Sequence, residues 1–208
     1  MRMAELSCQQ FVEELASKKA VPGGGGAAAL LGAVGTALAS MVANLTVNKK
    51  KYADYQADME QILIQTQKLQ QRFLEMIDED AENFKPLASA YHLPSNTPSE
   101  QAYKAAVLEK ATRQALKTPI ALVKTVFEAI QLHADLVDKG SILALSDVGV
   151  GIVALRAALL SGWLNVKINT QSLQDRAFAQ SVETELKIIV DEGTKRCDQI
   201  YQRVESKL

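Results

Sequence analysis

The sequence stretch 22-PGGGGAAALLGAVGTALA-39 decides the fold class of this chain. It opens with four consecutive glycines, Gly23 to Gly26, continues with small apolar residues, and meets no charged residue before Lys49. A charge-free segment of this length could span a bilayer, but it also fits a helix that is buried in a helical bundle. Because alanine supplies most of its apolar bulk and the rest of the chain is rich in charged residues, we expect a buried bundle helix and no membrane association.

The glycine run itself resembles a phosphate-binding loop only superficially. It lacks the Lys-Ser/Thr pair of a P-loop and follows a predicted helix instead of a strand, so nucleotide binding is disfavoured. Bare backbone amides at a helix N-terminus would suit a carboxylate or a polar ring edge of a ligand. The alternative interpretation is a tight turn that allows close helix packing, and both interpretations stay open.

The other long segments show the 3.6-residue periodicity of amphipathic helices, and none combines strand-like alternation with β-branched residues. The sequence therefore predicts an all-α fold with no sheet, as a single domain over residues 1–208. We expect an elongated bundle of about six helices, one of them very long. The expected helices cover residues 5–17, 25–47, 52–91, 98–138, 148–165 and 173–206. Thr97, Pro98 and Glu100 form a capping box at the start of the fourth helix, and Pro119 should kink or break that helix. Ser146 is the expected cap of the fifth helix.

The longest expected helix, 52–91, predicts an assembly. Its roughly 60 Å length exceeds the dimensions of a compact globule of 208 residues, whose radius of gyration is about 17 Å. Small residues at i, i+4 spacing on the preceding helix would let another helix approach closely. This stripe consists of Ala28, Gly32, Thr36 and Ser40. We therefore expect a homodimer held by apolar helix faces, with the stripe in the contact.

Composition excludes several classes of protein. The net charge of −1 lacks the basic surplus of a nucleic-acid binder, and the N-terminus lacks the apolar core of a signal peptide. Cys8 and Cys197 are too few for a disulfide framework or a zinc site, and two histidines without a third ligand disfavour a catalytic metal. The expected setting is the cytoplasm, with no metal and no nucleic-acid partner.

One carboxylate interrupts the apolar stripe of the longest helix. Asp80 falls in line with Phe73, Met76, Phe84 and Leu87. Desolvation there would raise its pKa towards the range of a general acid or base. Alternatively, Asp80 is a structural carboxylate bonded to a neighbouring helix N-terminus or to an arginine, for which Arg156 is the candidate.

Two further features carry weaker signals. His133 shares a face with Val126 and Ile130, where a histidine is more often a core residue than a catalytic one. The lysines of 48-NKKKY-52 favour a helix C-terminus, although Lys50 would also suit the anionic tail of a ligand if a pocket lies nearby.

Four segments together resemble one family, that of formiminotetrahydrofolate cyclodeaminase and methenyltetrahydrofolate cyclohydrolase. They occur in the family's order over nearly the whole chain. The segments are 21-VPGGGGAAALLGAVGTALASMVANLT-46 with the lysines that follow, 77-IDEDAENF-84 with a nearby Leu-Pro, 146-SDVGVGIVALRAALLSGWLNVKIN-169, and 173-LQD-175. The resemblance implies an all-helical cytoplasmic homodimer that acts on folate one-carbon adducts.

The resemblance also implies site residues. It favours Asp80 and the glycine loop, which physical reasoning had already singled out, and adds Asp78, Asp147 and Asn165. Asp80 and Asp147 would be catalytic, while the substrate, a tetrahydrofolate derivative, would contact Gly23, Gly24, Gly25, Gly26, Lys50, Asp78 and Asn165. No permanently bound cofactor is implied, and a separate formiminotransferase is an expected partner.

The chain departs from the family pattern at three places. Gly26 stands where serine is common, Asn48 where glycine is usual, and residues 141–145 lack the asparagines expected before Ser146 and Asp147.

Three functions remain open. The main expectation is closure of 5-formiminotetrahydrofolate to 5,10-methenyltetrahydrofolate with release of ammonia, a step of histidine degradation. The alternatives are methenyltetrahydrofolate cyclohydrolase and, because of the altered loop, a non-catalytic helical module that binds folate.

Overall fold

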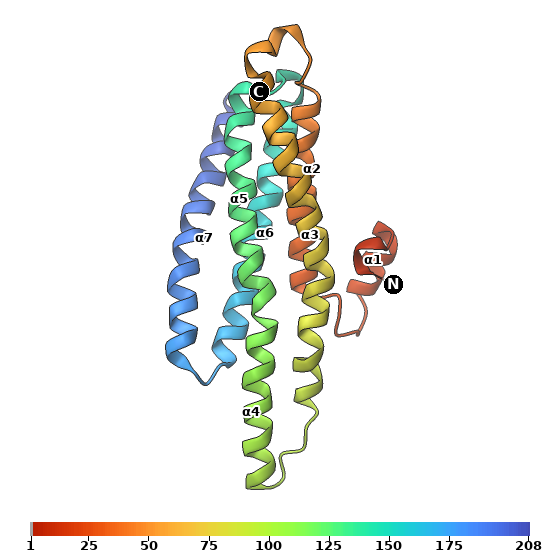
Figure 1. Ribbon diagram of the computed structural model, residues 1–208, viewed down its shortest axis with the longest axis vertical. Coiled ribbons are helices and arrows are strands. Elements are labelled where there is room, and N and C mark those ends of the chain that lie inside the picture. The colour runs from red at the N-terminus through yellow and green to blue at the C-terminus, as the bar shows by residue number, and fades with distance from the viewer. Residues whose placement is uncertain (1) are drawn as a thin grey trace.

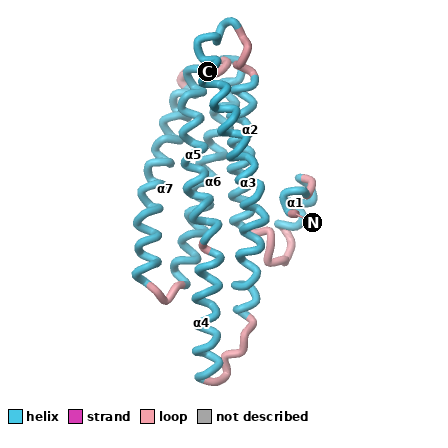
Figure 2. The backbone as a smooth tube through the Cα atoms, in the orientation of Figure 1, coloured by secondary structure: helices cyan, strands magenta, loops and turns pink. Residues whose placement is uncertain are grey.

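The computed structural model describes residues 2–208, and these residues form a long bundle of α-helices (Figure 1). Figure 2 shows helices joined by short loops, and no strand occurs in the described part of the chain. The all-α prediction is confirmed. The helices are α1 (Cys8–Leu15), α2 (Gly24–Asn44), α3 (Gln56–Tyr91), α4 (Pro98–Ala115), α5 (Lys117–Lys139), α6 (Leu145–Ser172) and α7 (Arg176–Glu205), with short 3-10 helices η1 (Met3–Glu5), η2 (Lys50–Tyr55) and η3 (Ile142–Ala144).

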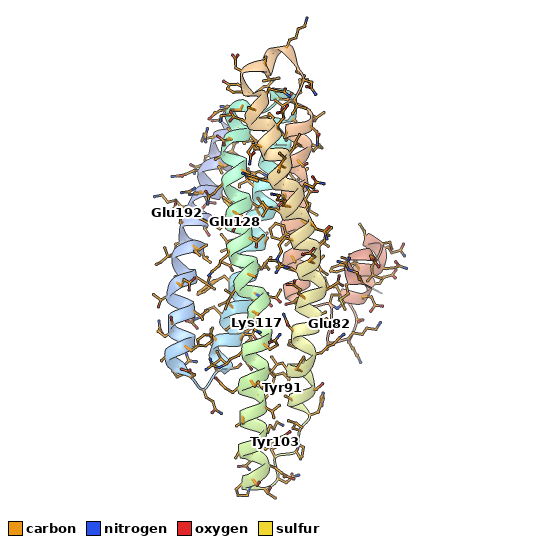
Figure 3. All side chains as sticks on the ribbon, viewed as in Figure 1. Glu82, Tyr91, Tyr103, Lys117, Glu128 and Glu192 are labelled. Atoms are coloured by element: carbon orange, nitrogen blue, oxygen red, sulfur yellow. The ribbon has the colours of Figure 1, made fainter. Side chains whose placement is uncertain are left out.

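The main helices pack in two layers. One layer contains α3, α5 and α7, and the other contains α2 and α6. Between the layers, α2 packs against α3 and α5, and α6 packs against α5 and α7. The core between the layers is apolar and includes Phe73, Ile130, Leu155 and Leu159, whose side chains have no exposed surface. The predicted very long helix is α3, with 36 residues. Its C-terminal turns and α4 extend beyond the other helices as a hairpin that carries Tyr91 and Tyr103 (Figure 3).

The small residues of α2 serve packing within the chain. A Cβ atom added to Gly32 would lie 2.6 Å from the Phe73 ring, and one added to Gly35 would lie 2.8 Å from the backbone oxygen of Gly151. Ala28 and Thr36 have no exposed surface. The prediction that this stripe contacts a second subunit is therefore wrong: the stripe lets α3 approach α2, and Gly32→Leu would overpack the chain's own core.

Local sequence signals explain most helix ends. Thr97 accepts a hydrogen bond from the Glu100 backbone N–H, and Glu100 reaches back to Thr97, so the predicted capping box is confirmed. The expected break near Pro119 occurs at Leu116, and the proline lies in the first turn of α5, where no intrahelical N–H is needed.

Four helix starts differ from expectation by three or four residues, and two of them are α3, which begins at Gln56 instead of 52, and α7, which begins at Arg176 instead of 173. α1 begins at Cys8 because Ser7 and Gln10 form a capping box, not near residue 5. Ser146 is not the cap of α6: the helix begins at Leu145 directly after η3, and it continues to Ser172 instead of ending at Asn165.

Candidate active site

The Asp80 carboxylate lies against the N-terminus of α2. Its Oδ2 accepts a hydrogen bond from the Gly26 backbone N–H at 3.1 Å. A Cβ atom added to Gly25 would lie 2.2 Å from Asp80 Oδ1, so only glycine fits at this position. A Cβ atom at Gly26 would meet nothing closer than 3.7 Å. The glycine run thus provides a bare surface that receives a carboxylate from α3.

Burial at this contact raises the pKa of Asp80 from 3.8 to about 6, and the hydrogen bond from Gly26 partly offsets the rise. A carboxyl group with this pKa can both accept and release a proton near neutral pH. The alternative arginine partner is wrong, because Arg156 Nε binds Asp198 Oδ1 of α7 at 2.8 Å. Asp80 instead binds a helix N-terminus, as the other structural alternative proposed, and this geometry is compatible with catalysis.

Asn165 borders the same place from α6. Its Nδ2 atom lies 3.5 Å from the position that a Cβ of Gly24 would take, and it donates a hydrogen bond to the Ser161 carbonyl at 2.8 Å. The structure therefore brings together three glycines at the start of α2, one carboxylate from α3 and one amide from α6. We call Gly24, Gly25, Gly26, Asp80 and Asn165 the Asp80 group.

A polar network beside the Asp80 group was not predicted. Asn83, one helical turn beyond Asp80, donates a hydrogen bond to Thr118 Oγ1 at 2.8 Å and accepts one from Gln114 Nε2 at 2.6 Å. These bonds join α3 to α4 and α5 next to the candidate site. The sequence feature that could have indicated this network is the i, i+3 spacing of Asp80 and Asn83, two polar residues in an otherwise apolar stripe.

Asp78 holds the N-terminal segment instead of facing Asp80. Its Oδ1 accepts a hydrogen bond from the Met3 backbone N–H at 2.6 Å, and its Oδ2 accepts one from Arg2 Nε at 3.1 Å. Gly23 is the N-cap residue of α2 and offers no side chain. Contacts of these two residues with substrate stay predictions.

The remaining two predicted residues belong to η2 and to the first turn of α6, two segments at the other end of the bundle, the upper end in Figure 1. Asp147 is in the first turn of α6, and the 18 residues that separate it from Asn165 place it about 27 Å away along the helix. Lys50 lies in η2, is exposed, and forms no ion pair with residues 2–208. We call these two residues the Lys50 group.

The altered loop 141–145 also lies at this end. The Ile142 backbone N–H donates to Tyr52 Oη at 3.0 Å, and the Ser141 N–H donates to Thr46 Oγ1 at 2.8 Å. The bond from Ile142 lowers the pKa of Tyr52. The loop is therefore held next to the Lys50 group, and one chain does not bring all the predicted site residues together.

His133 is a core residue of α5, in line with the commoner expectation for its position. It has no exposed surface, its Nδ1 lies 3.2 Å from the Ala129 carbonyl, and burial lowers its pKa to about 4. Its Nε2 has no hydrogen-bond partner in residues 2–208.

One hollow of the described chain lies away from Asp80. It is a groove of about 630 Å³ between α5 and α7, lined in part by Gln131, Lys195 and Gln199. Among residues 2–208, no three His, Cys, Asp or Glu side chains lie close enough to bind one metal ion.

Comparisons with known proteins identify related sequences and a solved structure of the same fold. The family model described as formiminotransferase-cyclodeaminase matches residues 7–188. The chain is 40% identical over 200 residues to a protein of Methylorubrum extorquens named methenyltetrahydrofolate cyclohydrolase, with 96% of each chain covered. It is 30% identical to the formimidoyltransferase-cyclodeaminase of Sus scrofa, of which it spans only 36%. The crystal structure of a formiminotetrahydrofolate cyclodeaminase from Thermotoga maritima superimposes with a TM-score of 0.81 at 25% identity, covering 98% of this chain and 96% of the other.

Proposed function

The chain belongs to the formiminotransferase-cyclodeaminase family of folate one-carbon enzymes, and on this premise we propose that it hydrolyses the methenyl bridge of 5,10-methenyltetrahydrofolate. One observation carries the choice of reaction. The relative named for this activity is 40% identical over 96% of both chains, whereas the bifunctional pig protein is 30% identical and is matched over about a third of its length. We therefore rank cyclohydrolase activity above cyclodeaminase activity, although the sequence analysis favours the cyclodeaminase.

The proposed reaction needs one base and one water. The water oxygen bonds to the cationic methenyl carbon while Asp80 takes a water proton. One carbon–nitrogen bond then breaks, the freed nitrogen takes a proton, and a formyl group remains on the other nitrogen, so that one water is consumed and one proton is released. The pKa of about 6 supports this role, since Asp80 is mostly ionised at pH 7 and its charge attracts the cationic bridge.

The other members of the Asp80 group are proposed to bind and orient the folate ring. The free backbone amides at the α2 N-terminus can donate to polar atoms of the ring edge. The Asn165 amide, which lies beside Gly24, offers both a donor and an acceptor. These contacts would hold the methenyl carbon next to Asp80, and positioning of this kind can supply much of the rate enhancement.

Cyclodeamination of 5-formiminotetrahydrofolate is the second candidate, and the likeness to the Thermotoga maritima structure favours it. In that reaction the N10 atom attacks the formimino carbon and ammonia leaves. The same carboxyl group would accept the N10 proton and return a proton to the departing ammonia. Both reactions therefore require Asp80, and the difference lies in whether water or N10 is the nucleophile.

Two assays on one preparation test the proposal. We expect loss of methenyl absorbance faster than in enzyme-free buffer, with less or no ammonia released from the formimino substrate. Ammonia release as the dominant activity would favour the second candidate. Folate binding with neither activity would leave a non-catalytic binding module, and the absence of both binding and turnover would contradict all three functions.

A further inference from the structure

The α3–α4 hairpin, residues 87–115, has a small apolar core that is separate from the main core of the bundle. This core contains Leu87, Ala111 and Ala115, with Phe84 and Leu108 packed against it. The hairpin extends beyond the other helices at the end of the bundle where α2 begins (Figure 1). A unit with its own core can move as one body, because its internal contacts stay intact when it moves relative to the bundle.

The two helices that lead into the hairpin are each interrupted by a proline at its base. Pro86 lies inside α3 and has no N–H to donate to the Glu82 carbonyl. Pro119 lies in the first turn of α5 and has no N–H for the carbonyl of Ala115, the last residue of α4. Helices bend most readily where a proline interrupts their hydrogen bonds, so each of the two has one point of reduced stiffness.

These two points lie at the same level of the bundle. The Asn83 side chain donates a hydrogen bond to Thr118 Oγ1 at 2.8 Å, which joins α3 to α5 between the two prolines. Figure 3 likewise places Glu82 and Lys117 at one height. We call residues 83–86 and 116–119 the hinge, because bending at both segments together would tilt the whole hairpin.

A second set of contacts holds α4 to the turn between α6 and α7. Glu109 Oε2 accepts a hydrogen bond from the Gln174 backbone N–H at 2.7 Å, and Arg113 Nη2 binds Asp175 Oδ2 at 2.7 Å. The Arg113 guanidinium also lies 4.4 Å from the centre of the Phe178 ring. The Arg113 and Asp175 side chains are 37% and 46% exposed, and ion pairs between exposed side chains contribute little to stability. These contacts, which we call the latch, can therefore break while the hairpin stays folded.

The hinge and the latch connect the two helices that flank the Asp80 group, α3 and α6. The hinge begins one helical turn after Asp80, and the latch binds the turn that follows Ser172, about 10 Å along α6 from Asn165. In the latched structure, Asp80 is largely withdrawn from water and lies directly against the start of α2. A ligand ring that reaches this carboxylate needs a way in, and tilting the hairpin would loosen the connection between α3 and α6.

We propose that the α3–α4 hairpin is a gate for the Asp80 group: it tilts open at the hinge when the latch breaks, and the latch re-forms over a bound ligand. The proposal rests on the proposed function only for the identity of the ligand, a folate. Closure suits this ligand, because a carboxylate attracts a cationic methenyl bridge more strongly in a site that is shielded from bulk water.

Energy transfer within one chain measures the position of the hairpin. The donor is Trp163 of α6, the single tryptophan of the sequence, and the acceptor is a thiol-reactive dye on Tyr103→Cys, an exposed position of α4. Cys8 is exposed and is replaced by serine, whereas Cys197 is buried. We expect time-resolved fluorescence to show a shorter major distance and a longer minor distance, and tetrahydrofolate to reduce the longer one. If dimers form, a second chain with Trp163→Phe and no dye confines the transfer to one chain.

Two variants should change the distances in opposite directions. Arg113→Ala removes the ion pair with Asp175, so it should raise the ratio of open to closed hairpin by about twofold to fivefold. Pro86→Ala, at an exposed position, restores an N–H to α3 and should lower this ratio. As a matched control, Arg196→Ala removes an arginine of similar exposure that pairs with Glu192 on α7, and it should leave both distances unchanged.

The rate of ligand entry gives a second readout. Because tetrahydrofolate enters only the open form, its association rate in stopped-flow experiments should follow the open fraction. We therefore expect faster association with Arg113→Ala, by about twofold to fivefold, and slower association with Pro86→Ala. If the latch were only structural, Arg113→Ala would lower the melting temperature without changing the association rate, and this result would overturn the gate.

Other outcomes would also overturn the gate. They are a single distance that neither tetrahydrofolate nor the two variants change, and an equal change in the Arg196→Ala control. Failure of the proposed function is a separate result, because the distances are measured without turnover. A protein with two distances that binds no folate would support the hairpin motion and contradict the folate ligand, whereas full turnover with a single distance would overturn only the gate.

Discussion

The two outer faces of the bundle differ in chemistry although both belong to amphipathic helices. The outer face of α3, α5 and α7 follows the usual pattern of a solvent-exposed surface, with ion pairs such as Arg196 with Glu192 and Lys124 with Glu185. The outer face of α2 and α6 is apolar and nearly free of charge. Helices that are apolar all round are normally buried all round. The first face is therefore a typical charged surface, whereas the second exposes apolar side chains of the kind that mark interaction surfaces.

The candidate site follows the same division. The glycines and Asn165 belong to α2 and α6, and Asp80 reaches the glycines from the inner side of α3. Substitutions in or against the α2–α6 layer should therefore change turnover or assembly. Comparable substitutions on the outer face of the other layer should change neither.

The largest expected effect is that of Asp80→Asn. The variant keeps the shape of the side chain but cannot exchange a proton, so turnover should fall by roughly 10² to 10⁴ with little change in folate binding. Steady-state kinetics and folate titration check this, with Glu128→Gln on the outer face of α5 as the control. A variant with a lowered melting temperature but near-normal turnover per folded molecule would identify Asp80 as a structural carboxylate only.

Two adjacent glycines offer a sharper comparison within α2. Gly25→Ala places a Cβ 2.2 Å from Asp80 Oδ1 and must displace the carboxylate, whereas Gly26→Ala meets no atom within 3.7 Å. We expect turnover to fall by about 10² for Gly25→Ala, because a displacement near 1 Å at a reacting group has this effect, and to change little for Gly26→Ala. Equal activity of the two variants would show that the position of Asp80 is not critical.

Charge insertion distinguishes the two outer faces directly. Val34→Asp places a carboxylate on the exposed apolar side of α2, so it should weaken the expected homodimer by roughly 2 to 4 kcal/mol. Gln131→Glu, on the exposed side of α5, should leave association unchanged. Sedimentation over a concentration series measures both, and identical behaviour of the two variants would remove the distinction between the faces.

The smallest expected effect is the pH dependence that Asp80 contributes. Its pKa is raised from 3.8 to about 6, so between these pH values the folded state binds more protons than the unfolded state and stability falls as pH rises. Because the Asp80 carboxyl group is only partly buried, we expect the free energy of unfolding to fall by about 1 to 2 kcal/mol across this pH interval. Activity should change in the opposite direction, increasing as pH passes 6 and the base forms.

The measurement must be a difference between the wild type and Asp80→Asn. His133, whose pKa burial lowers to about 4, gives stability an opposite slope between pH 4 and 6.5. This contribution cancels when denaturant unfolding of the two proteins is compared at each pH. A difference that does not depend on pH would contradict the raised pKa of Asp80.

The sequence predicted the features that depend on local pattern. The helical periodicity, the Thr97 capping box and the position of Asp80 in an apolar stripe all follow from the spacing of residues along one helix. The glycine run and Asp80 were identified separately on physical grounds, and the structure joins them. The contact between Asp80 and the glycine run could not be predicted from the sequence, because periodicity shows which side of a helix is buried but not which helix covers that side.

The wrong expectations have the same physical origin. The small-residue stripe indicates a close helix approach, and whether α3 or another subunit makes that approach depends on tertiary packing. Arg156 was the candidate arginine in one alternative for Asp80, but its guanidinium binds Asp198. The site roles of Lys50 and Asp147 stay predictions, and the order of the family motifs carries no information about the roughly 27 Å between Asp147 and Asn165.

The contact between Asp80 and Gly25 also fixes the register of two antiparallel helices. Gly25 and Gly32 are seven residues apart on α2, and their partners Asp80 and Phe73 are seven residues apart on α3. A slip of one heptad would keep the apolar faces in contact, because α2 offers mostly alanine, glycine and leucine along its length. It would, however, press Asp80 against Gly32, far from the free N–H groups at the start of α2, where a buried carboxylate would have no donor. The residue proposed to move the proton therefore also excludes the misaligned pairing that such a featureless helix would otherwise permit.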